Sequence, residues 1–152
     1  MATVLNILER TIVIPGASPG IKLGLANIMT LLSIMMLGGK DAIIIVAVRC
    51  FLGALVGGNV ISFLFSITGG LLSVLVMVIM WRYLNKYISI VNISMVGAVF
   101  HNIGQLFVAS LIIHDFSVYV ILPILMISAI ITGYIVGIVT KQLYKSLGNR
   151  MI

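Results

Sequence analysis

Acidic residues are nearly absent from this chain of 152 residues, which contains only Glu9, Asp41 and Asp115. Enzymes that hold Mg²⁺ on a phosphate or diphosphate substrate use clustered carboxylates as ligands. The three acids lie far apart in the sequence, so no such cluster can be read from it. The composition therefore argues against phosphoryl transfer, and it excludes this chain as the catalytic subunit of a prenyl transferase.

Other chemical signatures are also missing. The one cysteine, Cys50, cannot form a disulfide within the chain, and His101 has no second His, Cys or acid at metal-ligand spacing. No Ser or Cys is placed beside a His as a nucleophile beside its base, and no phosphate-binding loop ending in Lys-Ser or Lys-Thr occurs. We therefore expect no catalytic residue, no metal and no cofactor.

Hydrophobic residues, in contrast, are abundant. They make up 62% of the chain against 8% charged residues, and the mean hydropathy is +1.32. Soluble domains are about 45–50% apolar, so the sequence predicts an integral membrane protein. The net charge of +6 is better explained by membrane topology than by nucleic acid binding, and no nucleic acid partner is expected.

The apolar runs predict an all-α bundle that forms a single transmembrane domain over residues 1–152. Strand-like alternation is absent, and breaks fall at Gly-rich turns and at His114-Asp115. Residues 1–13 resemble the end of a helix too short to cross a bilayer. Five full spans are predicted after this partial helix, at 21–37, 42–60, 62–84, 93–113 and 118–144.

The basic residues predict the orientation. With the C-terminus in the cytoplasm, only Arg10 and Lys22 of the loop cations face outward, which agrees with the positive-inside rule. We therefore expect a multi-pass protein of the cell membrane with a cytoplasmic C-terminus. The cations on the inner side would be Lys40, Arg82, Lys86, Lys141, Lys145 and Arg150.

Arg49 is the one charge deep within a predicted span. An intramembrane charge is costly and needs a partner, and it marks a functional site by default. One interpretation is structural, namely an ion pair with Glu9 or hydrogen bonds to Asn102 and Gln105. The other makes Arg49 the countercharge of an anionic ligand.

Further polar residues are candidates for the same site. His101, Asn102 and Gln105 share one arc of the fourth span, and with Asn27 and Arg49 they are predicted to line a cavity that opens outward. For His101 an interhelical hydrogen bond explains the sequence about as well as a ligand contact. Two weaker candidates complete the predicted binding set: Lys22, which can also snorkel to headgroups, and Asn59, which can also cap a turn.

Four segments carry a resemblance to a known family. They are PGIKLGLANI at 19–28, RCFLGALVGGN at 49–59, FSITGGLLS at 65–73 and GAVFHNIGQL at 97–106. Together they resemble the Gx transporter family, also described as heptaprenyl diphosphate synthase component I, which is similar to the S-components of energy-coupling factor transporters. The likeness extends from Glu9 to about residue 143.

The resemblance implies a six-helix, membrane-embedded subunit of a small-molecule importer that binds its substrate from outside. It also implies a transmembrane coupling subunit and paired ATPases as partners. S-components begin with a complete first helix, whereas only residues 1–13 precede the Pro/Gly loop here, and we predict that this start is truncated.

The resemblance leaves a second function open, that of a non-catalytic membrane accessory subunit of a polyprenyl diphosphate synthase. An apolar cavity with one cation and several amides suits a vitamin, a quinone precursor or an isoprenoid phosphate equally well. A channel ranks last because the full spans contain no carboxylates.

Overall fold

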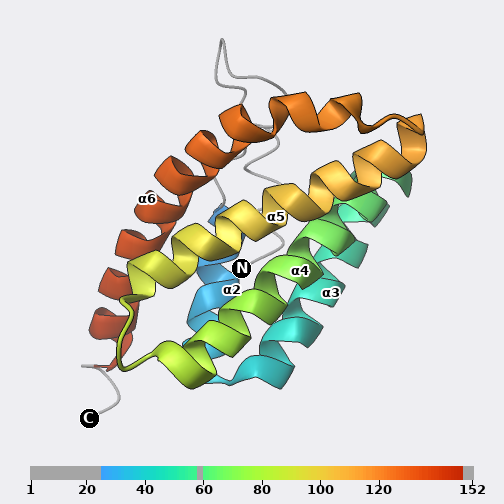
Figure 1. Cartoon of the computed structure of the whole chain (residues 1–152). Helices are drawn as coiled ribbons and strands as arrows, with labels where there is room; N and C mark the ends of the chain where they lie inside the picture. The colour runs from blue at the N-terminus through green and yellow to red at the C-terminus, as the bar shows by residue number, and fades with distance from the viewer. Residues whose placement is uncertain (1–24, 58–59, 149–152) are drawn as a thin grey trace.

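A computed structural model describes residues 25–57 and 60–148 of the chain. This part is helical throughout (Figure 1). Its elements are α2 (Leu25–Met36), α3 (Gly39–Gly57), α4 (Val60–Leu84), α5 (Ile90–Ile113), the 3₁₀ helix η1 (Phe116–Ile121) and α6 (Leu122–Gly148). The predicted all-α class is therefore confirmed.

Helices α3 to α6 pack in chain order, each against the next, and α2 lies behind α5 in Figure 1, where it contacts all four. The buried core lies between α2, α3 and α4 and reaches the first turns of α5. Its members are Leu31, Ile34, Ala42, Val46, Cys50, Val74, Met77 and Ile93.

Three segments are long and apolar enough to cross a membrane: Val60–Leu84, Ile90–Ile113 and Phe116–Leu147. Helix α3 has 19 residues, but Lys40, Asp41 and Arg49 interrupt its apolar character, and the apolar part of α2, Asn27–Met36, is shorter. The predicted membrane character is thus supported, whereas the count of five full spans stays a prediction. Residues 1–24, and with them the partial first helix, lie outside the described residues.

The first interhelical turn is tighter than predicted. Gly38 adopts φ +106°, a conformation that favours glycine, and its N–H and that of Leu37 donate to the carbonyl of Ser33 at 3.0 and 2.8 Å. Helix α3 can therefore begin at Gly39, so that Lys40 and Asp41 belong to its first turn and not to a loop. Asp41 is well placed there because a carboxylate is favourable near a helix N-terminus.

The last predicted span also begins differently. His114 ends α5 in the left-handed conformation with φ 55°, and Asp115 caps η1. Residues 116–121 thus form a 3₁₀ helix before α6, which accepts Pro123 in its first turn because a first-turn N–H needs no intrahelical acceptor.

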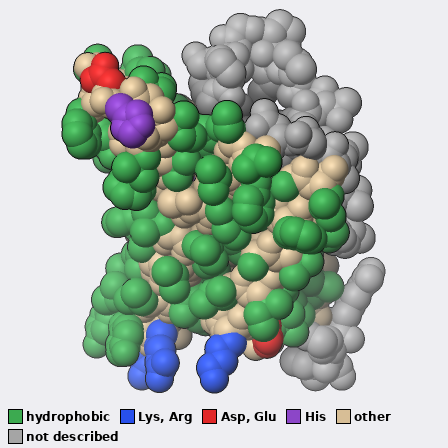
Figure 2. Space-filling model, turned by 90° about the vertical axis from the view of Figure 1, so that its right-hand side faces the viewer, with side chains coloured by type: hydrophobic (Ala, Val, Ile, Leu, Met, Phe, Trp, Pro, Cys, Tyr) green, Lys and Arg blue, Asp and Glu red, His purple; other side chains and the backbone are tan. Residues whose placement is uncertain are grey.

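The cations of the helix ends gather at one end of the bundle. Because the helices alternate in direction, Lys40, Arg82, Lys86, Lys141 and Lys145 all lie at this end together with Asp41, and His114 and Asp115 lie at the other. Figure 2 shows the Lys and Arg side chains of one face gathered at one end, below a broad hydrophobic surface. We call this the basic end.

Candidate functional site

Arg49 lies inside the helix bundle. It stands ten residues after Gly39, the first residue of α3, and its side chain is only 4% exposed. At 1.5 Å per residue this places its Cα about 15 Å from the start of the helix at the basic end. The hydrocarbon core of a bilayer is about 30 Å thick, so Arg49 would stand near half that depth if α3 crosses the bilayer as predicted.

The guanidinium of Arg49 has more donors than acceptors around it. Nη1 donates to Oγ1 of Thr30 at 3.4 Å, a long hydrogen bond, and Nε is buried with no partner among the described residues. Asp41 and Asp115, the two acids in the described part of the chain, are both exposed and form no ion pair with it. Glu9, which is one of the partners that the sequence offers for Arg49, lies outside the described residues. The surroundings of Arg49 thus suit an additional acceptor.

Glycine on α4 makes room for this side chain. A Cβ built on Gly70 would lie 2.9 Å from Cγ1 of Val46 and 3.6 Å from Nη2 of Arg49. The guanidinium therefore lies against the α4 backbone, between α2, α3 and α4.

His101 and Gln105 meet the neighbouring glycine on α4. A Cβ on Gly69 would lie 3.2 Å from Cε1 of His101 and 3.0 Å from Cγ of Gln105. The structure thus brings both side chains to the level of α4 that Arg49 also contacts, although they approach from α5 and Arg49 approaches from α3. His101 and Gln105 contact α4 at Gly69, and Arg49 contacts it at the next residue, Gly70.

Asn102 faces a different neighbour. Its Nδ2 donates to the carbonyl oxygen of Leu125 on α6 at 2.9 Å. This hydrogen bond links α5 to α6 and directs the amide toward α6. The observed role of the side chain is to join two helices, which favours a structural role for Asn102 over the ligand contact predicted from the sequence.

The structure says less about the remaining predicted site residues, which are Asn27, Lys22 and Asn59. Asn27 on α2 is partly buried and lies one turn before Thr30, on the same face of the helix. Lys22 and Asn59 lie outside the described residues. Within the described ranges no group of three metal-ligating side chains is found.

Sequence reasoning missed Thr30, the hydrogen-bond partner of Arg49. The spacing from Asn27 places it on the same face, but the spans contain many Ser and Thr residues, and only the packing of α2 against α3 selects this one. It also missed Ser73, whose buried Oγ has no hydrogen-bond partner in the part of the chain that is described.

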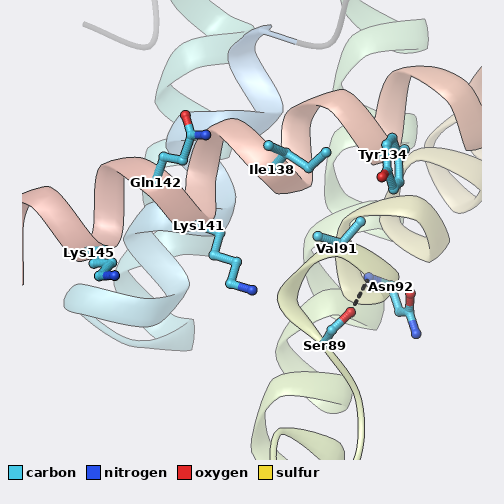
Figure 3. Close-up of a pocket in the computed structure, with 8 residues that line it drawn as sticks. All are labelled: Ser89, Val91, Asn92, Tyr134, Ile138, Lys141, Gln142 and Lys145. Carbon is cyan, nitrogen blue, oxygen red and sulfur yellow. Dashed lines mark hydrogen bonds between the residues drawn. The ribbon is translucent and has the colours of Figure 1, made fainter.

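A groove of about 550 Å³ opens between α5 and α6 near the basic end (Figure 3). Its two lysines, Lys141 and Lys145, belong to the cations that predict the orientation of the chain. The groove is lined by Ser89, Val91, Asn92, Tyr134, Ile138, Lys141, Gln142 and Lys145. It is separate from Arg49, which lies on α3.

Comparison with known proteins gives one match. A family model described as heptaprenyl diphosphate synthase component I matches residues 1–143, which include α2, α3, α4, α5, η1 and most of α6. Neither the curated proteins nor the solved structures give a match.

Proposed function

Because the chain belongs to the heptaprenyl diphosphate synthase component I family, we propose that it is a non-catalytic binding subunit embedded in the membrane. In this proposal Arg49 holds the anionic group of a small amphipathic molecule inside the bundle. The observation that carries it is the buried guanidinium, whose Nε has no acceptor among the described residues.

The energetics of a buried charge support this role. An arginine within a bilayer costs at least about 2.5 kcal/mol on the most lenient insertion scale unless it is paired. A carboxylate or phosphate can accept two parallel hydrogen bonds from a guanidinium, and such charge-assisted pairs are about twice as strong as neutral ones. A bound anion would thus offset a cost that the long bond to Thr30 offsets only in part.

The surrounding polar groups would orient the rest of the ligand. Thr30 and Asn27 approach from α2, while His101 and Gln105 reach the same level of α4 from α5. The groups that pack beside the guanidinium at Gly70 are small or apolar, among them Val46 and Cys50, which suits an amphipathic ligand more than a hydrated ion.

In this function the chain itself carries out no chemical step. Its three acids cannot form the aspartate clusters that hold Mg²⁺ on a diphosphate, and the sequence contains no nucleotide-binding loop. We propose that this binding subunit serves a small-molecule importer, which would draw its energy from a coupling subunit with ATPases, as in the S-components that the sequence resembles. The basic end would face the cytoplasm under the positive-inside rule, with the C-terminus on that side of the cell membrane.

The test is ligand retention by variants at Arg49. The wild-type protein, purified in mild detergent, should carry a small anionic molecule that native mass spectrometry detects, and Arg49→Met should lose it. Arg82→Met is the matched control, because Arg82 is exposed at the basic end and its substitution removes the same charge. Equal retention by wild type and Arg49→Met would make Arg49 structural.

A second function is favoured by the family description itself, which names a component of a heptaprenyl diphosphate synthase. In this alternative the chain is a membrane accessory subunit, and the diphosphate of an isoprenoid is the anion that Arg49 holds. Deletion of the chain should then shorten or abolish polyprenyl products in cell extracts. Unchanged chain elongation, together with a ligand that is not an isoprenoid, would leave the import function.

A further inference from the structure

The groove between α5 and α6 has a polar and an apolar part. Lys141 and Lys145 lie on the last turns of α6, and Ser89 and Asn92 lie at the start of α5. Val91, Ile138 and Tyr134 supply the apolar wall, and Tyr134 is seven residues, or about 10 Å of helix, before Lys141. The polarity therefore rises along the groove toward the basic end.

The groove is cationic without a compensating acid. None of its lining residues is Asp or Glu, and neither lysine forms an ion pair with any described residue. Lys141 and Lys145 are four residues apart on one helix, a spacing at which like charges repel. Figure 3 shows Lys141 extending from α6 toward the first turn of α5. An anion between the two helices would relieve this repulsion.

The two ammonium groups are the charged donors of the groove. The N–H of Asn92 in the first turn of α5 already donates to Oγ of Ser89 at 3.3 Å, as the dashed line in Figure 3 marks. An anion would therefore pair mainly with Lys141 and Lys145, and the hydroxyl and amide side chains of the lining could add uncharged hydrogen bonds.

The neighbouring surface of α6 indicates where the ligand comes from. Ile127, Ile131 and Ile135 are exposed by 62, 57 and 51% within the segment that is long and apolar enough to span a membrane. These side chains would face the hydrocarbon of a bilayer, so a ligand can enter the groove sideways from the lipid. A freely soluble anion would gain nothing from the apolar wall at Tyr134 and Ile138.

We propose that the groove between α5 and α6 binds an anionic membrane lipid, whose phosphate headgroup lies between Lys141 and Lys145 and whose first chain segments lie along Ile138 and Tyr134. Phosphate pairs well with lysine ammonium groups, and basic pockets between membrane helices are suited to anionic headgroups. This site is independent of Arg49 and of the function proposed above.

The experiment measures lipid retention from micelles that contain equal amounts of phosphatidylglycerol and phosphatidylcholine. Wild-type protein should retain phosphatidylglycerol preferentially in native mass spectra. The double variant Lys141→Gln/Lys145→Gln should lower that retention by about tenfold or more, the effect expected when a charge-assisted contact is lost.

The matched control is Arg82→Gln/Lys86→Gln, which removes two positive charges from the same end but outside the groove. Its retention should stay within about twofold of wild type, because only general surface attraction is reduced. An equal loss in both double variants would assign the effect to the charge of the basic end as a whole and overturn the proposal.

An uncharged variant tests the groove itself. Ile138→Trp fills the apolar part with a larger side chain and should lower retention while both lysines remain. Unchanged retention in this variant would overturn the proposal, as would equal retention of phosphatidylcholine by the wild type. Displacement of the lipid by millimolar inorganic diphosphate alone would show that the site takes a soluble anion instead.

Discussion

Gly104 of α5 lies directly against Gly69 of α4, so that a Cβ added to Gly104 would stand 2.8 Å from the Cα of Gly69. The two backbones touch at the level where His101 and Gln105 meet α4. Small residues at helix crossings allow this approach where lipid supplies no hydrophobic force between helices. The position of these polar side chains therefore depends on this glycine pair.

Substitution of Gly104 by alanine should weaken the α4–α5 contact. The new methyl group would meet backbone atoms of Gly69 and Thr68, which cannot move aside by a change of rotamer. We expect a loss of about 1–3 kcal/mol of stability, measured as a lower thermal midpoint in detergent.

Gly39→Ala is the comparison variant for this prediction. The three atoms nearest to a Cβ there all belong to the side chain of Val78, with Cγ1 at 2.6 Å. Because a side chain can shift more easily than a helix backbone, the loss should be smaller than for Gly104→Ala. Equal losses would contradict the assignment of the α4–α5 pair as the tighter contact.

Removal of the charge at Arg49 should not destabilise the empty protein. Arg49→Met keeps much of the side-chain volume and eliminates a buried guanidinium that has one long hydrogen bond. We expect an unchanged or higher thermal midpoint in protein freed of ligand, since an incompletely paired buried charge lowers stability. A clearly lower midpoint would show that the contacts of Arg49 within the chain outweigh its desolvation.

Asn102 should affect stability and not ligand binding. Asn102→Leu removes the hydrogen bond to the carbonyl of Leu125, and interhelical hydrogen bonds in membranes contribute about 0.6 kcal/mol on average. We expect a small drop in the thermal midpoint and unchanged retention of the anionic ligand. Loss of the ligand at an unchanged midpoint would instead return Asn102 to the binding site.

Asp115 should make the turn between α5 and η1 sensitive to acid. The backbone N–H of Ser117 donates to Asp115 Oδ1 at 2.8 Å, and this bond, with a contribution from the Ser117 hydroxyl, lowers the pKa of the carboxyl. A lowered folded-state pKa stabilises the fold above the ordinary pKa of Asp, and that contribution disappears as the pH falls through the lowered value.

The measurement compares thermal midpoints of the wild type and Asp115→Ala across pH. The variant should be less stable at pH about 6, and the difference should shrink once the pH is below about 4. A difference that stays constant down to low pH would show that the carboxylate charge plays no part in the cap.

The sequence predicted the class of fold and the breaks between helices more reliably than the exact ends. His114-Asp115 ended a span as predicted, because a polar pair of turn-forming residues after a long apolar run favours a break in the helix. The Gly38–Asp41 turn was predicted too long. Whether Lys40 and Asp41 join the helix depends on the left-handed conformation of Gly38, which composition does not reveal.

The candidate site could be predicted from the sequence only in part. Helical spacing correctly put His101, Asn102 and Gln105 on one face, but a face of about 100° in a bundle can touch two neighbours. Asn102 therefore bonds to α6 while His101 and Gln105 contact α4. Which residues of a polar face share a site depends on helix crossings, and these are long-range properties that local spacing cannot supply.

Close backbone contacts at glycines join some helices of the bundle more rigidly than others. Added Cβ atoms on Gly133 and Gly137 of α6 would stand 2.7 and 2.6 Å from Cα atoms of α5, so α5 is locked by its backbone to α6 as it is to α4. Helix α3 instead meets α4 through side chains such as Val46, which can repack. Sliding between helices requires such adaptable contacts. A ligand that binds Arg49 would therefore be expected to move α3 relative to α4, α5 and α6. These three helices would move as one rigid unit.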